Sequence, residues 1–88
     1  MLTLPSTLTH DEAPACLALW LTQLPMGHGQ VVQLDGSALQ RFDSSALSLL
    51  LALRRHLLAR GQTLSLVAVP PRLAELATLY GVDELLAA

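Results

Sequence analysis

The sequence predicts a single small α/β domain over residues 1–88, in which helices pack against a short mixed sheet. Three observations support this fold class. Gln30–Leu34 and Leu64–Val69 are short apolar segments of the kind found in strands. Ala15–Leu24 and Asp43–Arg60 are longer and repeat apolar residues at the three-to-four spacing of a helix. These segments alternate along the chain without an internal repeat or a linker, which is typical of α/β domains.

The N-terminal part of the chain is expected to form one strand and one helix. Leu2–Pro5 is a short apolar segment closed by a proline, so we predict a strand there. Thr9 or Asp11 can cap the helix at Ala15–Leu24, because a side-chain oxygen can accept a hydrogen bond from a free amide of the first turn. Proline and glycine at positions 25–29 predict a loop after this helix.

The helix in the middle of the chain is the most informative segment. A turn predicted at Asp35–Ser37 follows the first long strand. Asp43 or Ser44 can cap the N-terminus of the helix, and Gly61 is expected to stop it after Arg60. At 100° per residue, one side gathers a core stripe of Ala46, Leu49, Leu50, Leu53 and Leu57.

This helix carries more leucines than one core stripe requires. The side opposite the stripe is polar and holds Ser44, Ser48 and Arg55. Next to it lies an apolar shoulder of Leu47, Leu51 and Leu58. Two interpretations are open for the shoulder: it packs under a neighbouring helix, or it presents an apolar edge to a partner.

The C-terminal part of the chain is expected to add one more helix. Pro70 and Pro71 favour its start, and Gly81 favours its end. One side of this helix is expected to carry Leu73, Leu76, Ala77 and Tyr80. A final turn is expected at Val82–Leu86.

Composition excludes several classes of protein. Hydrophobic residues make up 52% of the chain and charged residues 14%, which argues against disorder. The net charge of -2 and the five scattered arginines argue against nucleic-acid binding. The single cysteine, Cys16, is expected to be a buried and inert thiol. The sequence has neither the pattern of a signal peptide nor an apolar run near the roughly 20 residues of a membrane span, so we expect a cytoplasmic protein without membrane insertion.

Catalysis is poorly supported by the residues present. His10, His28 and His56 lack the spacing of metal ligands, so no metal site is expected. No glycine-rich phosphate loop is found, and neither Ser44 nor Cys16 has a histidine at a spacing that predicts a nucleophile pair. We therefore expect a protein that is not an enzyme and needs no cofactor.

The order of elements, together with two motifs, resembles a known family. Asp43 to Leu47 reads DSSAL and looks like the DSSGL motif of the STAS domain, the fold of bacterial anti-sigma factor antagonists. Leu76 to Leu86 reads LATLYGVDELL and is similar to the C-terminal helix of the MlaB branch. The resemblance covers about Gln30 to Leu86. The family usually begins with a β-hairpin, whereas this chain offers one N-terminal strand, so the sheet is expected to have three strands or to complete itself by another route.

The resemblance implies a function. MlaB proteins are cytoplasmic subunits that bind the ATPase of an ABC-type phospholipid transporter, which maintains outer-membrane lipid asymmetry. The resemblance places Ser44 on the surface that docks on the ATPase. Together with the rest of the motif and the outward side of the helix, this predicts the partner-binding residues Asp43, Ser44, Ser45, Leu47, Ser48, Leu51 and Arg55. The alternative is an anti-sigma factor antagonist, a protein-interaction switch gated by phosphorylation of Ser44 or Ser45. In either case the domain would act by binding another protein.

Two structural expectations accompany this interpretation. The strands at Val31–Leu34 and Leu64–Val69 should be adjacent and parallel, because a helix connects them, and both should be nearly fully buried. An incomplete N-terminal sheet leaves an unpaired strand edge, so the isolated subunit could form a homodimer through its N-terminal strand.

Overall fold

The computed structural model describes residues 2–24 and 29–82, which form three helices and five short strands. The helices are α1 (Ala13–Gln23), α2 (Ser45–Ala59) and α3 (Pro71–Leu79). The strands are β1 (Leu2–Thr3), β2 (Thr7–Leu8), β3 (Val31–Asp35), β4 (Arg41–Phe42) and β5 (Thr63–Val67). The predicted helices and the two long strands are present with boundaries shifted by up to two residues. The turn expected at Val82–Leu86 lies, apart from Val82, outside the described residues.

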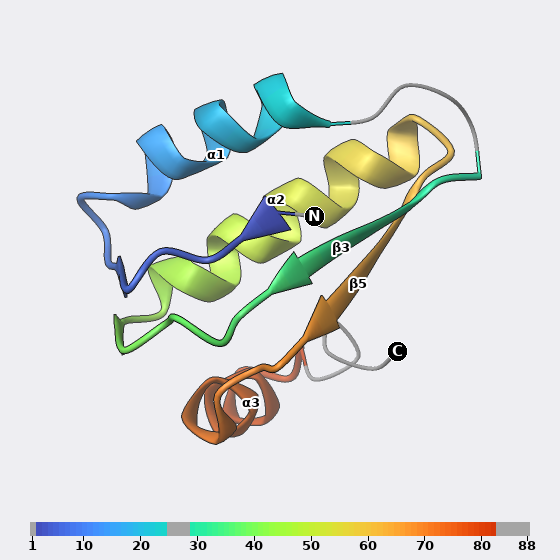
Figure 1. Ribbon diagram of the computed structural model, residues 1–88. Helices are drawn as coiled ribbons and strands as arrows, with labels where there is room; N and C mark the ends of the chain where they lie inside the picture. Colours follow the sequence, from blue (N-terminus) through green and yellow to red (C-terminus); the bar gives the residue numbers. More distant parts are fainter. Residues whose placement is uncertain (1, 25–28, 83–88) are drawn as a thin grey trace.

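The main sheet has three strands in the order β1-β3-β5 (Figure 1). β3 and β5 are adjacent and parallel, as predicted, and Val32 lies opposite Leu64. β1 also pairs in parallel with β3, and every pairing among the described residues is parallel rather than mixed. Parallel strands need a long connection, and such crossovers are usually right-handed. Here the connection between β3 and β5 contains α2.

The N-terminus supplies two strands before the first helix, not the single strand expected. β1 joins the main sheet, whereas β2 pairs in parallel with β4 in a separate two-stranded ladder. β1 and β2 therefore do not pair with each other as a hairpin. Each pairs instead with a later segment of the chain. β1 forms one edge of the main sheet, where the predicted homodimer contact would lie; that dimer remains a prediction.

The expectation that both long strands are nearly fully buried is wrong. In β3, Val32 and Leu34 are buried, whereas Val31 and Gln33 are exposed. Most of β5 is only half-buried. Alternating burial means that one face of the sheet is covered and the other is open. Figure 1 shows α1 and α2 beside each other along the sheet, with α3 beyond the end of β5.

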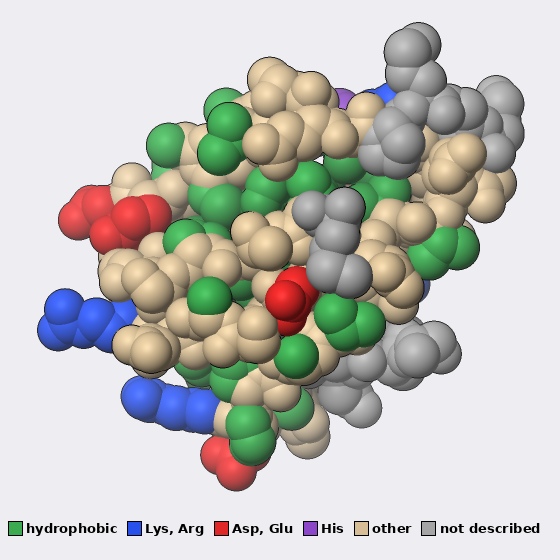
Figure 2. Space-filling model, viewed as in Figure 1, with side chains coloured by type: hydrophobic (Ala, Val, Ile, Leu, Met, Phe, Trp, Pro, Cys, Tyr) green, Lys and Arg blue, Asp and Glu red, His purple; other side chains and the backbone are tan. Residues whose placement is uncertain are grey.

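The core lies between the sheet and the helices α1 and α2. The whole predicted stripe of α2 is buried: Ala46, Leu49, Leu50, Leu53 and Leu57. Hydrophobic side chains are also visible along the seam below α1 in the space-filling view (Figure 2). In α3, Leu73 and Ala77 are buried and Leu76 is half-buried, whereas Tyr80, the C-cap residue, is exposed.

The caps of α1 differ from the expectation. Neither Thr9 nor Asp11 caps the helix with its side chain; Glu12 occupies the N-cap position. The Glu12 carboxylate accepts hydrogen bonds from the Thr9 hydroxyl and from the Thr9 backbone N–H, the latter at 3.1 Å. These bonds, above all the one from the Thr9 hydroxyl, lower the pKa of Glu12. Cys16 is half-buried, and burial raises the pKa of its thiol, which favours the protonated form.

The ends of the parallel strands meet at a tight junction. The Gly36 N–H donates to the Val67 carbonyl at 2.9 Å. A Cβ at Gly36 would lie 3.2 Å from the Leu4 side chain and 3.3 Å from the Ala68 carbonyl oxygen, so a glycine suits this close approach. Ala68 itself has a φ of 55°, a left-handed conformation that an L-residue adopts at a cost.

Replacing Ala68 with glycine is therefore expected to stabilise the domain. Removing a strain of about 1–2 kcal/mol offsets the entropy cost of a glycine, about 0.5–1 kcal/mol, so the net gain should be up to about 1.5 kcal/mol. Urea unfolding measures the change. Ala18→Gly, at an exposed position inside α1, is the control and should cost about 1 kcal/mol. A loss of stability in both variants would contradict the strain at Ala68.

Candidate partner-binding surface

Asp43 organises the N-terminus of α2. Its Oδ1 accepts a hydrogen bond from the Ser45 backbone N–H at 2.8 Å, and its Oδ2 accepts one from the His10 backbone N–H at 3.2 Å. One carboxylate therefore satisfies a free amide of α2 and ties the helix to the loop before α1. The bond from the Ser45 N–H is the main cause of a lowered pKa for Asp43. Ser44 is the N-cap residue, and its side chain makes no capping hydrogen bond.

The stabilisation by Asp43 is expected to depend on pH. Because its pKa is lower in the folded protein, its contribution is present above the ordinary aspartate value of about 3.9 and is lost as the pH falls through the folded value. Asp43→Ala should therefore melt at a lower temperature than the wild type at pH 7, and the difference should shrink at pH values below about 4. Thermal melts over a pH series measure this, and a difference that stays constant with pH would contradict it.

One side of α2 is open to solvent. Ser44, Ser48 and Arg55 are exposed, and Leu51 beside them is half-buried against the core. We call these four residues the docking edge. Leu58 continues the same side and is 52% exposed. Because the core stripe points the other way, substitutions at Ser44, Ser48 or Arg55 leave the core intact.

Leu47 does not belong to the docking edge. It was predicted as a partner-binding residue, but its side chain is 3% exposed and packs in the core cluster. Of the two interpretations left open for the apolar shoulder, burial therefore applies to Leu47 and exposure to Leu58. The helical period gives the direction of each side chain around the helix axis. It does not show which of these directions neighbouring elements cover.

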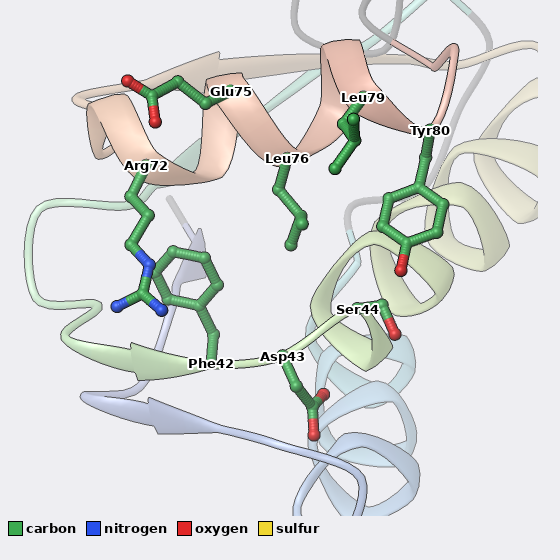
Figure 3. A pocket seen from close by; sticks show the side chains of 8 residues that line it. All are labelled: Phe42, Asp43, Ser44, Arg72, Glu75, Leu76, Leu79 and Tyr80. Carbon is green, nitrogen blue, oxygen red and sulfur yellow. The ribbon is translucent and has the colours of Figure 1, made fainter.

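Two hollows flank the N-terminal half of α2. The larger, which we call the α2–α3 groove, has a volume of about 530 Å³. It is lined by Phe42, Asp43, Ser44, Arg72, Glu75, Leu76, Leu79 and Tyr80 (Figure 3). The Arg72 guanidinium carbon lies 5.8 Å from the centroid of the Phe42 ring, within the range of a cation–π contact.

The smaller hollow lies between α1 and α2 and has a volume of about 340 Å³. Ser45 and Ser48 line its α2 side, and His10 and Leu17 line its α1 side. Ser44 and Ser45 are adjacent in the sequence but line different hollows. The N-terminal end of the docking edge therefore lies between the two hollows. Ser45 is half-buried, whereas Ser44 is exposed.

Neither hollow gathers the groups expected of a metal site. Among residues 2–24 and 29–82, no three histidine, cysteine or acidic side chains come together where they could hold a metal ion. Similarly, no helix within the described ranges is long and apolar enough to cross a membrane. The surface combines hydroxyl groups, charged side chains that include an arginine over an aromatic ring, and apolar contact area.

Comparison with protein families identifies a matching family. The family model described as "Mlab, STAS domain" matches residues 1–87. The chain belongs to this STAS family. No curated protein and no solved structure matches the chain. The STAS assignment agrees with the small α/β fold with parallel strands. In the structure, the DSSAL motif lies at the start of the α2 helix.

In this STAS domain, part of the α2–α3 groove could not be located from the sequence. The helical pattern predicted that Asp43 and Ser44 lie at the start of a helix. Phe42 belongs to a two-residue strand, which is too short to give a periodic signal. Leu76, Leu79 and Tyr80 fall in the segment that resembles the MlaB branch, yet nothing in that segment shows that it faces Ser44. The end of β5 and the two prolines after it bring α3 there.

Proposed function

We propose that this STAS domain is a non-catalytic subunit that binds the ATPase of an ABC-type phospholipid transporter. It would lie in the cytoplasm, peripheral to the inner membrane, and support a transporter that maintains outer-membrane lipid asymmetry. The Mlab family match supports the class of complex. The observation that carries the proposal is the docking edge, a helix side next to the DSSAL motif whose residues, apart from the half-buried Leu51, are exposed.

The composition of the docking edge suits a protein partner. Ser44 and Ser48 are small, so a partner helix or loop can approach α2 closely. The Arg55 guanidinium can bind a carboxylate or carbonyl groups with several N–H donors at once. Leu58 and the exposed part of Leu51 add apolar area that association would remove from water. Binding here would leave the open face of the sheet untouched.

The test is to place a charge on the docking edge. Ser44→Glu and Ser48→Glu should each abolish co-purification with the co-expressed ATPase, because an unpaired charge in an interface costs several kcal/mol of binding. Thermal stability should change by only about 0.5 kcal/mol, since both residues are exposed. Thr22→Glu, at an exposed position on α1, is the control and should bind normally. Retained binding by both edge variants would move the interface elsewhere.

The second candidate function is a switch gated by serine phosphorylation. Its support is the exposure of Ser44, which a kinase could reach. A phosphate there would stand beside the Asp43 carboxylate, which is charged at neutral pH, so it would meet repulsion within the domain as well as disturb a partner. Mass spectrometry of the protein from its native cells tests this candidate; an unmodified chain under all growth conditions would eliminate it.

A further inference from the structure

The charge that faces the α2–α3 groove differs from the summed formal charge of the residues that line it. Asp43, Glu75 and Arg72 give a formal charge of -1. Figure 3, however, shows the carboxylate of Glu75 on the outer side of α3 and that of Asp43 directed away from the groove. Asp43 is engaged there by the N–H groups of Ser45 and His10. The charge that faces the groove is therefore the positive one, on Arg72.

The Arg72 guanidinium lies over the Phe42 ring. A guanidinium in contact with an aromatic ring can still form hydrogen bonds through the N–H donors at the edges of its plane. Within the part of the chain that the structure describes, no carboxylate forms an ion pair with Arg72. Such a guanidinium can bind a carboxylate through two parallel hydrogen bonds.

The rest of the groove combines polar residues with exposed apolar side chains. Leu76 points into it, Leu79 is 80% exposed and Tyr80 is 59% exposed (Figure 3). Leu79, the last residue of α3, and the adjacent C-cap residue Tyr80 form exposed apolar area that association would remove from water. The Tyr80 hydroxyl points towards Ser44, the first residue of the docking edge, so the two surfaces are continuous.

We propose that the α2–α3 groove binds a segment of the partner that carries a leucine or phenylalanine next to an aspartate or glutamate. The acidic side chain pairs with Arg72, and the apolar side chain packs between Leu76 and Leu79. This inference rests on the proposed function, since the segment would belong to the ATPase. A basic segment would be repelled by the positive guanidinium, and a bare phosphate would pair with one cation but leave the apolar side chains of the groove uncovered.

The first experiment measures binding of the purified ATPase to variants of the full chain. Arg72→Glu and Leu79→Asp should each weaken binding at least tenfold, without a change in thermal melting, because both residues are exposed. Arg41→Glu makes the same charge change at an exposed residue that does not line the groove and should bind like the wild type. If Ser44→Glu abolishes binding but both groove variants bind normally, the groove proposal is overturned and the proposed function stands.

The second experiment does not need the ATPase. The peptide acetyl-Glu-Leu-Glu-Leu-Phe-amide is titrated into isotope-labelled protein, beside the same peptide with lysine in place of glutamate. We expect NMR shifts at Arg72, Leu79 and Tyr80 with the acidic peptide alone. If the wild-type chain does not bind the ATPase but these shifts appear, the proposed function fails and the groove chemistry stands. Absent shifts, or equal responses to both peptides, would overturn the groove proposal.

Discussion

Replacing Trp20 with alanine is expected to unfold a large fraction of the protein. Trp20 is 2% exposed, and its Nε1–H donates a hydrogen bond to the Thr3 carbonyl at 3.2 Å. The side chain thus joins α1 to β1. Truncation of a buried tryptophan costs about 3–5 kcal/mol. Typical stabilities per residue give an 88-residue domain only about 4–13 kcal/mol in total.

Far-UV circular dichroism with urea unfolding measures this effect, because the variant lacks the only tryptophan of the chain. Trp20→Phe keeps most of the buried area and loses the hydrogen bond, so its cost should be smaller, about 1–2 kcal/mol. Leu19→Ala is the neighbouring control: Leu19 is 57% exposed, and its loss should cost less than about 1 kcal/mol. Equal effects at positions 19 and 20 would contradict the packing of α1 on the sheet.

The sequence was most informative where one element alone determines burial. The stripe from Ala46 to Leu57 follows from the helical period, and all of its predicted members are buried. Its direction is fixed because five apolar residues must face the same way to leave water. The strands were harder to interpret. Their apolar composition could not show that helices cover only one face of the sheet, so burial of β3 and β5 was overestimated.

Features made by several distant segments could not be predicted. β2 and β4 are two residues each, too short for a periodic signal, and they pair across 34 positions of sequence, from Thr7 to Arg41. The cap of α1 was assigned to the wrong residue, because Thr9 and Asp11 are of the types that prefer the N-cap position, whereas glutamate is not. The α2–α3 groove likewise depends on where α3 packs.

The α2 helix has one buried side and one exposed side, and this division bears on how the domain would bind a partner. A buried α2 stripe anchors the helix, and the Asp43 carboxylate fixes its N-terminus against the loop before α1. The docking edge is thereby presented on a rigid element, which lowers the entropy lost on association. No residue of the edge is needed for the fold except Leu51, which packs partly on the core. Binding and stability are therefore expected to respond to different substitutions on the same helix.

A matched pair of leucines on α2 tests that separation. Leu47→Asp places a carboxylate in the core, where Leu47 is 3% exposed, and an unpaired buried charge costs about 3–5 kcal/mol. Leu58→Asp makes the same change at a 52% exposed position near the C-terminus of the helix, where the cost should stay below about 1 kcal/mol. Thermal and urea unfolding of the two variants, beside the wild type, give the comparison.

The pH dependence of these two variants sharpens the test. Burial would raise the pKa of the new carboxyl in Leu47→Asp, so its neutral form is tolerated better and the deficit from the wild type should shrink as the pH falls from 7 to 5. The exposed carboxyl in Leu58→Asp should give a nearly constant difference over that range. If Leu47→Asp were as stable as Leu58→Asp at pH 7, Leu47 would be a surface residue after all. The docking edge would then extend across the full apolar shoulder of α2.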